Sequence, residues 1–264
     1  AYGLTLPSGI TGLDDYDVQA CNTVEWVKQG WVDYINPQLY WSRDYAGQDY
    51  DVLCEWWAKD VCEHFSNQLP NNKKVHFFVS QAAYHAYDDY KGYEDGVQEV
   101  KDQIDVNRQN LSSGYTGSVF YNTTAYCKMY QELKDSHFNH KALPPAMDWK
   151  VTETLAAPSN MAVNGNTLSW EHASAERFTV YVYPKGFDVE TGAQATYLKQ
   201  IVYGTSIQLD NNELVSTIAV CTYDRFGVEH GVAVWNEGKF PESDPNATEI
   251  TWVLNGGEVK ERVA

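Results

Sequence analysis

Gln38, Tyr40 and Trp41 stand at the end of an apolar, aromatic run and have the chemistry of a sugar-binding site. The run from Trp31 to Tyr40 is typical of a buried parallel strand, and a polar loop follows it at 42–49. Planar hydrogen-bonding groups beside aromatic faces suit a saccharide. The alternative is a buried strand whose aromatic residues serve only the core, because short apolar runs are ambiguous.

Polar and aromatic residues also follow three other predicted strands. Ser8 follows a strand at Tyr2–Leu6, Gln81 and Tyr84 follow one at Lys74–Ser80, and Tyr121 and Asn122 end one at Gly117–Tyr121. Carboxyl ends of parallel strands converge when a barrel closes. We therefore predict the substrate-binding residues Gln38, Tyr40, Trp41, Gln81, Tyr84, Tyr121 and Asn122. The alternative is that Gln38 and Gln81 satisfy backbone groups of neighbouring loops.

Ionisable residues near these strand ends are few. Asp44 is the candidate catalytic acid or base, although loop carboxylates are mostly solvated. His85 could act as a general base, but a hydrogen-bonded loop histidine is the more ordinary interpretation. Asp33 lies at the opposite end of its strand, so we interpret it as structural. The acidic group at 88–95 lacks EF-hand spacing, and no zinc pattern is present, so we expect no metal and no cofactor.

Four strand–helix units position these residues within 1–150. The expected helices run from Asp14 or Asp15 to Gly30, from Asp49 or Asp51 to before Leu69, from Val97 to near Gly114, and over Tyr126–Leu133. Such repetition predicts parallel strands with right-handed crossovers. A complete (β/α)8 barrel takes about 250 residues, so four units amount to half of a TIM-type barrel. Because a half barrel leaves unpaired edges, we expect it to pair with a missing N-terminal half or with a second copy.

The pattern changes to short strands after Ala157, which predicts an antiparallel β-sandwich over 151–236. The tripeptide Asn164-Gly165-Asn166 is a strong hairpin signal. Residues 237–264 are expected to form a linker and a terminal hairpin around Asn255-Gly256-Gly257, or the start of a further domain. The fold class is thus α/β followed by all-β.

Composition excludes some function classes. The formal net charge of −17 repels phosphate backbones, so we expect no nucleic-acid partner. No segment is long and apolar enough to span a bilayer. The five cysteines form no CxxC pair, and we interpret them as buried structural thiols.

The first 150 residues resemble the carboxyl-terminal half of the glycosyl-hydrolase-like family 10 barrel. The stretches that carry this resemblance are Trp26–Trp41, Leu53–Trp57, Gln98–Arg108 with Gln103 and Arg108, and Ala142–Trp149. Residues 157–236 resemble a fibronectin type III module through Pro158, Trp170, Tyr181, Tyr183 and Asp224–Gly227. Ile218 departs from that module, which often has a tyrosine there.

These resemblances imply a bacterial glycoside hydrolase that is exported to the periplasm or cell surface, with a lipid anchor as one option. Some relatives in that family act on peptidoglycan strands stripped of their peptides. Such hydrolysis needs two carboxyl groups, which the family is expected to place on earlier strands than those of this chain. We therefore expect residues 1–264 to supply substrate-binding subsites without hydrolysing the glycan. The alternative is a non-catalytic carbohydrate-binding or structural module.

Overall fold

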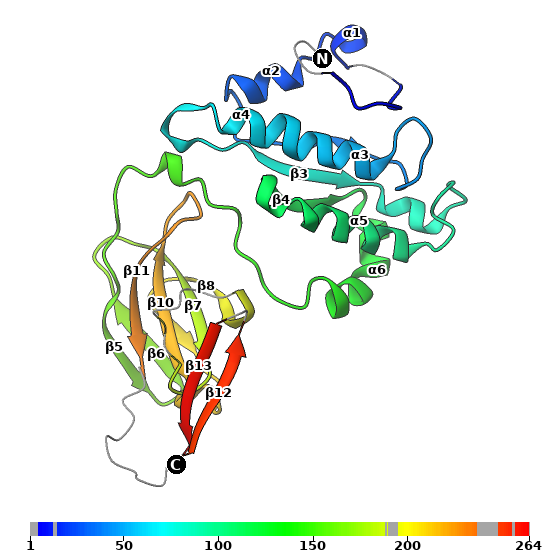
Figure 1. Ribbon diagram of the computed structural model, residues 1–264. Helices are drawn as coiled ribbons and strands as arrows, with labels where there is room; N and C mark the ends of the chain where they lie inside the picture. The colour runs from blue at the N-terminus through cyan, green and yellow to red at the C-terminus, as the bar shows by residue number, and fades with distance from the viewer. Residues whose placement is uncertain are drawn as a thin grey trace. The chain divides into compact units, whose positions relative to one another are not determined.

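The computed structural model describes residues 5–12, 15–187, 189 and 195–236, and the backbone of 248–254 and 257–263. The chain divides into two compact units, Ala1–Asn139 and His140–Ala264 (Figure 1). This boundary lies before the position near 150 that the sequence indicated. Each unit is described by itself below.

The first unit is built on a parallel sheet. Its strands are β1 (Tyr34–Ile35), β2 (Gln38–Leu39), β3 (His76–Gln81) and β4 (Tyr115–Phe120). β3 is central and pairs in parallel with β1, β2 and β4. Residues 2–4 of the first predicted strand, Tyr2–Leu6, lie outside the described residues, and Thr5 and Leu6 are not in a strand.

The strand predicted within the run from Trp31 to Tyr40 is interrupted at Asn36–Pro37. Tyr34 pairs with His76 and Gln38 pairs with Ser80, so the register is the same on both sides of the interruption. Pro37 has no N–H to donate to the ladder, although its carbonyl oxygen accepts from the Ser80 N–H at 3.0 Å. The two short strands therefore act as one strand against β3.

Helices follow the strands, with one correction to the predicted pattern. The single helix expected from Asp14 or Asp15 to Gly30 is wrong, since Ala20 has a φ of 53° and separates two short helices. The helices of this unit are α1 (Asp15–Gln19), α2 (Thr23–Lys28), α3 (Tyr50–Glu55), which continues as a π-helix (Trp56–Glu63) into α4 (His64–Ser66), α5 (Val97–Gln109) and α6 (Thr123–Ser136). The predicted cap Asp49 accepts from the Val52 N–H at 3.1 Å.

The two faces of the sheet differ sharply. Ile35, Leu39, Phe77 and Val79 point to one face and are buried against side chains of α2, α3 and the π-helix. Neighbouring residues in the strands point to the other face, where Tyr34 is 62% exposed and Val119 is 40% exposed. Helices therefore cover one face of this sheet, and the other carries exposed apolar side chains.

Two antiparallel sheets of the second unit share one core. One has the order β11-β10-β7-β8 and the other β5-β6-β9. The strands are β5 (Ser159–Asn164), β6 (Thr167–Glu171), β7 (Arg177–Tyr183), β8 (Leu198–Tyr203), β9 (Ser206–Gln208), β10 (Thr217–Tyr223) and β11 (Glu229–Trp235). Buried residues from both sheets, including Leu168, Trp170, Phe178 and Val220, form one core. Strand β11 was not among those the sequence indicated.

The carboxyl-terminal segment contains a two-stranded hairpin. Strands β12 (Thr248–Leu254) and β13 (Gly257–Val263) pair antiparallel. This pairing joins the strands on either side of the turn predicted at Asn255-Gly256-Gly257, of which Asn255 and Gly256 lie outside the described residues.

The cysteines differ in burial. Cys54, Cys62 and Cys221 are buried as predicted, whereas Cys21 is half-buried and Cys127 is exposed. The interpretation as buried thiols is thus wrong for Cys127.

Candidate functional site at the strand ends

Three predicted site residues meet at the carboxyl ends of the parallel strands. The ring centroids of Tyr40 and Tyr121 are 5.8 Å apart and stacked, and Tyr84 lies edge-on to both at 6.3 and 6.0 Å. The Tyr121 N–H donates to the Gln81 carbonyl oxygen at 2.9 Å, and the Tyr84 N–H donates to the Tyr121 carbonyl oxygen at 3.3 Å. Residues from three separate chain segments thus form one tyrosine cluster.

This tyrosine cluster combines apolar faces with hydroxyl groups. Tyr121 is 55% exposed, and Tyr40 and Tyr84 are half-buried. The hydroxyls of Tyr40 and Ser80 lie 3.2 Å apart, which fixes the Tyr40 ring. Because a tyrosine offers an apolar ring and a polar end, the cluster can stack on a sugar ring and hydrogen-bond its hydroxyls. Burial raises the pKa of Tyr84, so this phenol is neutral at physiological pH.

The other predicted residues have different surroundings. Gln38 is exposed, and its side chain makes no hydrogen bond among the described residues. Trp41 is half-buried and packs against the core beneath the sheet. Asn122 caps α6 by accepting from the Ala125 N–H at 3.1 Å. Gln81 is fully buried, so its side chain supports the site from within the protein.

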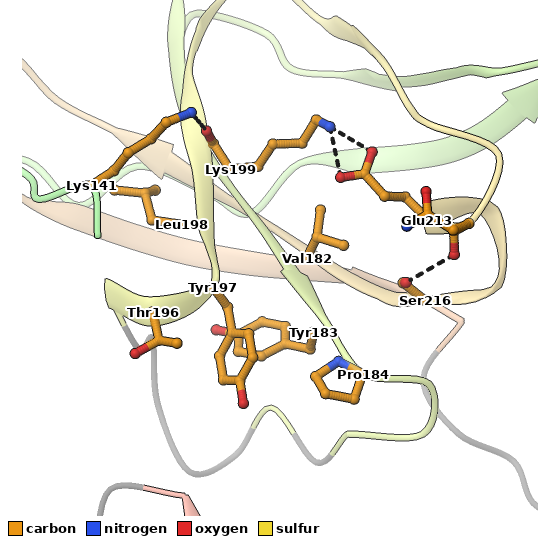
Figure 2. A pocket seen from close by; sticks show the side chains of 11 residues that line it. Lys141, Val182, Tyr183, Pro184, Thr196, Tyr197, Leu198, Lys199, Glu213 and Ser216 are labelled. Atoms are coloured by element: carbon orange, nitrogen blue, oxygen red, sulfur yellow. Dashed lines mark hydrogen bonds and ion pairs between the residues drawn. The ribbon is translucent and has the colours of Figure 1, made fainter. Parts of the chain in front are cut away.

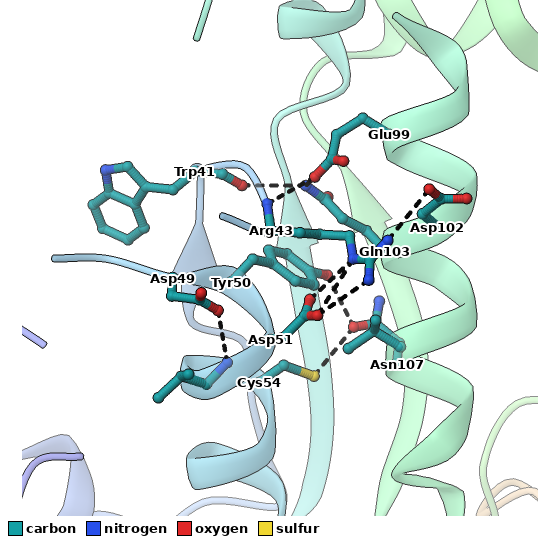
Figure 3. A network of polar contacts seen from close by, with 12 residues as sticks. Trp41, Arg43, Asp49, Tyr50, Asp51, Cys54, Glu99, Asp102, Gln103 and Asn107 are labelled. Atoms are coloured by element: carbon teal, nitrogen blue, oxygen red, sulfur yellow. Dashed lines mark hydrogen bonds and ion pairs between the residues drawn. The ribbon is translucent and has the colours of Figure 1, made fainter. Parts of the chain in front are cut away.

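A buried glutamine on α5 connects these strand ends (Figure 3). The Gln103 Nε2 donates to the Trp41 carbonyl oxygen at 3.1 Å, to the Tyr93 hydroxyl at 2.9 Å and to the Glu99 Oε1 at 3.0 Å. Its Oε1 accepts from the Gln81 Nε2 at 3.2 Å. Gln103 therefore holds the backbone at Trp41 and the side chain of Gln81 together.

Asn107 extends the same network one helical turn further along α5. Its Oδ1 accepts from the Tyr50 hydroxyl at 2.9 Å (Figure 3). Its Nδ2 donates to the Gln81 Oε1 at 3.4 Å. Glu99, Gln103 and Asn107 recur every four residues, which places them on one side of α5. The spacing of these three polar residues is visible in the sequence, although Gln103 alone was singled out there, through the family resemblance.

Arg43 fixes the loop after Trp41 and was missed by sequence reasoning. Its backbone N–H donates to the Glu99 Oε1 at 2.8 Å, and its guanidinium lies 3.2 Å from Asp51 and 3.3 Å from Asp102. The hydrogen bond to Asp51 raises the pKa of Arg43, which therefore stays charged. Burial raises the pKa of Glu99, although the Arg43 N–H and Gln103 oppose that effect. The paired acids in this network orient the loop and are not free carboxylates.

The remaining ionisable candidates lie apart from this network. Asp44 is exposed and its side chain has no hydrogen bond or ion pair within the described part of the chain. Asp33 pairs with Lys73 at 3.3 Å, in agreement with a structural role. His85 is hydrogen-bonded to Asp88, as the more ordinary interpretation expected. The described residues contain no group of side chains arranged to hold a metal ion.

The second unit has a separate shallow pocket of about 420 Å³. Figure 2 shows Lys199 paired with Glu213 on its wall, where their charged atoms lie 2.7 Å apart, with Tyr197 on another side. Lys141 donates to the Lys199 carbonyl oxygen. Because these charged groups bind one another, we assign no ligand to this pocket.

Among the residues that the structure describes, no helix has the length and apolar character needed to cross a membrane.

Comparison with known proteins identifies related proteins named as glycosyl hydrolases. The chain is 30% identical over 196 residues to glycosyl hydrolase YngK of Bacillus subtilis, which covers 71% of this chain and 36% of that protein. It is 36% identical over 107 residues to glycosyl hydrolase DigH of Escherichia coli K12, which covers 39% of this chain and 22% of that protein.

The matches thus span about a third of the length of YngK and about a fifth of the length of DigH. No family model and no solved structure matches the chain. The chain is therefore related to bacterial proteins that are named glycosyl hydrolases.

Proposed function

We propose that this chain forms the glycan-binding part of a bacterial glycoside hydrolase. The observation that carries the proposal is the cluster of Tyr40, Tyr84 and Tyr121 at the ends of neighbouring parallel strands. In (β/α) barrels such strand ends form the active site. Gln38 and Trp41 would add sugar contacts, while Gln81 and Asn122 would hold the cluster in place.

The uncovered face of the sheet supports a role within a larger barrel. Parallel sheets are normally covered on both faces, yet Tyr34 and Val119 expose apolar surface on one face here. We propose that further βα units of a longer protein, like the family 10 barrel, cover this face and supply the catalytic acids. A second copy of this chain is the alternative cover.

The substrate and setting are part of the same proposal. Peptidoglycan strands without peptides are the proposed glycan, and an exported protein of the cell envelope is the proposed setting. The two sheets of the second unit would form a fibronectin type III-like spacer. A purely structural or non-catalytic binding module is the second candidate, which the uncovered sheet face also favours.

The test is a calorimetric titration of residues 1–264 with peptide-free peptidoglycan strands. Tyr121→Ala should weaken binding by about tenfold, because aromatic stacking contributes about 0.5–1.5 kcal/mol beyond area burial. Tyr34→Ala is the matched control, since Tyr34 is also exposed but lies at the opposite end of the sheet. Its Kd should stay within about twofold of the wild type.

The same mixtures should be analysed for released sugars by mass spectrometry, and we expect none. Equal losses of affinity in both variants would place the binding site elsewhere. Sugar release that Asp44→Ala abolishes would mean that a working acid lies within this chain.

A further inference from the structure

His85 lies directly beside the tyrosine cluster in an aromatic environment of its own. It follows β3 in the short helical turn Ala83–Tyr87. Its ring stacks on Tyr90 with centroids 3.6 Å apart and contacts the Tyr84 ring at 4.1 Å. The His85 side chain is only 9% exposed. The imidazole therefore has a fixed plane next to a member of the cluster.

Asp88 fixes the tautomer of that imidazole in its neutral form. Its carboxylate oxygens lie 3.0 and 2.9 Å from the His85 Nδ1. The Tyr90 N–H donates to the Asp88 Oδ1 at 3.1 Å, which holds the carboxylate in place. A carboxylate can only accept here, so the proton of a neutral His85 must sit on Nδ1. The Nε2 atom then carries a free lone pair.

The Nε2 atom has no hydrogen-bond partner among the described residues. This unpaired nitrogen is not fully buried, so it is accessible to solvent. A mostly buried ring with one nitrogen fixed and the other open is suited to contact a ligand, because the same arrangement orients histidines in catalytic and metal sites.

We propose that His85, oriented by Asp88, contacts the glycan by accepting a hydrogen bond from a sugar hydroxyl at Nε2. This inference rests on the proposed function, because it names a further residue of the same glycan site. The tyrosine cluster supplies the faces on which a sugar ring stacks. His85 supplies an acceptor for a hydroxyl at the edge of that sugar ring. Asp88 is then a positioning residue.

The experiment uses long-range 1H–15N spectra of the labelled chain during titration with peptide-free peptidoglycan strands. Without glycan, His85 should show the tautomer with the proton on Nδ1, and Asp88→Asn should change this pattern. Added glycan should shift the His85 Nε2 resonance. The resonances of His64, which is exposed on α4, should not move.

Affinity measurements complete the test. His85→Phe keeps an aromatic ring for stacking on Tyr90 but removes both nitrogens, and it should weaken glycan binding by about tenfold. His64→Phe is the matched control and should leave Kd unchanged.

Three outcomes would overturn the contact. Glycan binding with no shift at His85 Nε2, or an unchanged Kd for His85→Phe, would mean that the His85–Asp88 pair only stabilises the loop, while the proposed function stands. A wild-type chain that binds no glycan would remove the proposed function and this contact with it.

Discussion

Replacing Gln103 with leucine should destabilise the first unit while leaving the second unit unchanged. Gln103 is fully buried and similar in volume to leucine, so the change removes polar atoms without opening a large cavity. The Trp41 carbonyl oxygen and the Tyr93 hydroxyl lose their donor, and the Gln81 Nε2 loses its acceptor. The cost therefore comes from groups that stay in the protein interior without partners.

The size of this effect follows from the number of groups left unpaired. Each buried polar group without a partner costs about 1–3 kcal/mol, and three such groups give about 3 kcal/mol if the structure relaxes in part. That free energy corresponds to an increase of about 100-fold in the population of the opened state.

Amide hydrogen exchange can measure this in each unit of the same sample. The Ser80 amide, in β3, should exchange about 100-fold faster in Gln103→Leu than in the wild type. The Val220 amide, in β10 of the second unit, is the internal reference and should keep its rate.

A matched control is Gln98→Leu, which changes an exposed glutamine on the same helix. It should alter exchange at Ser80 by less than about threefold, because surface substitutions cost little. An increase of less than about fivefold in the exchange rate of the Ser80 amide in Gln103→Leu would refute the reasoning, since it would mean that Trp41 and Gln81 find other partners or water. Equal acceleration at Val220 would refute the assignment of the effect to one unit.

Three further predictions concern single residues. Asn122→Ala should destabilise α6 by about 1 kcal/mol and Asn122→Asp should not, as measured by exchange of α6 amides, because only alanine lacks an oxygen to cap the helix. Burial opposes the effect, but hydrogen bonds from two backbone N–H groups and His230 lower the pKa of Asp224. The stability that this carboxylate contributes is therefore present above its unfolded pKa and lost as the pH falls below about 4. In Asp224→Asn, the stability of the second unit measured by amide hydrogen exchange should therefore fall less steeply with decreasing pH. Cys127 should react with a maleimide in the native chain while Cys54 reacts only after unfolding, because burial raises the pKa of Cys54 to about 12.

Several features of the fold could be predicted from residue patterns alone. Helix caps depend on a short side chain next to an amide three residues away, so Asp49 was identifiable from sequence. The strands of the second unit follow alternating apolar residues and turn signals, which are local as well. The prediction of a single first helix was wrong because Ala20 adopts a positive φ. Alanine rarely adopts that conformation, so the sequence does not indicate it.

In the candidate site, too, local features were predictable from the sequence, whereas contacts between distant residues were not. The sequence by itself placed Tyr40, Tyr84 and Tyr121 at strand ends, since that depends only on where each apolar run stops. Whether a strand-end side chain faces solvent or the interior depends on the pleat and on the partner segment, so the sequence could not separate exposed Tyr121 from buried Gln81. Packing in three dimensions brought Arg43 to Glu99 and the Tyr40 ring to the Tyr121 ring, because these contacts depend on how helices and loops pack around a sheet and not on any spacing along the chain.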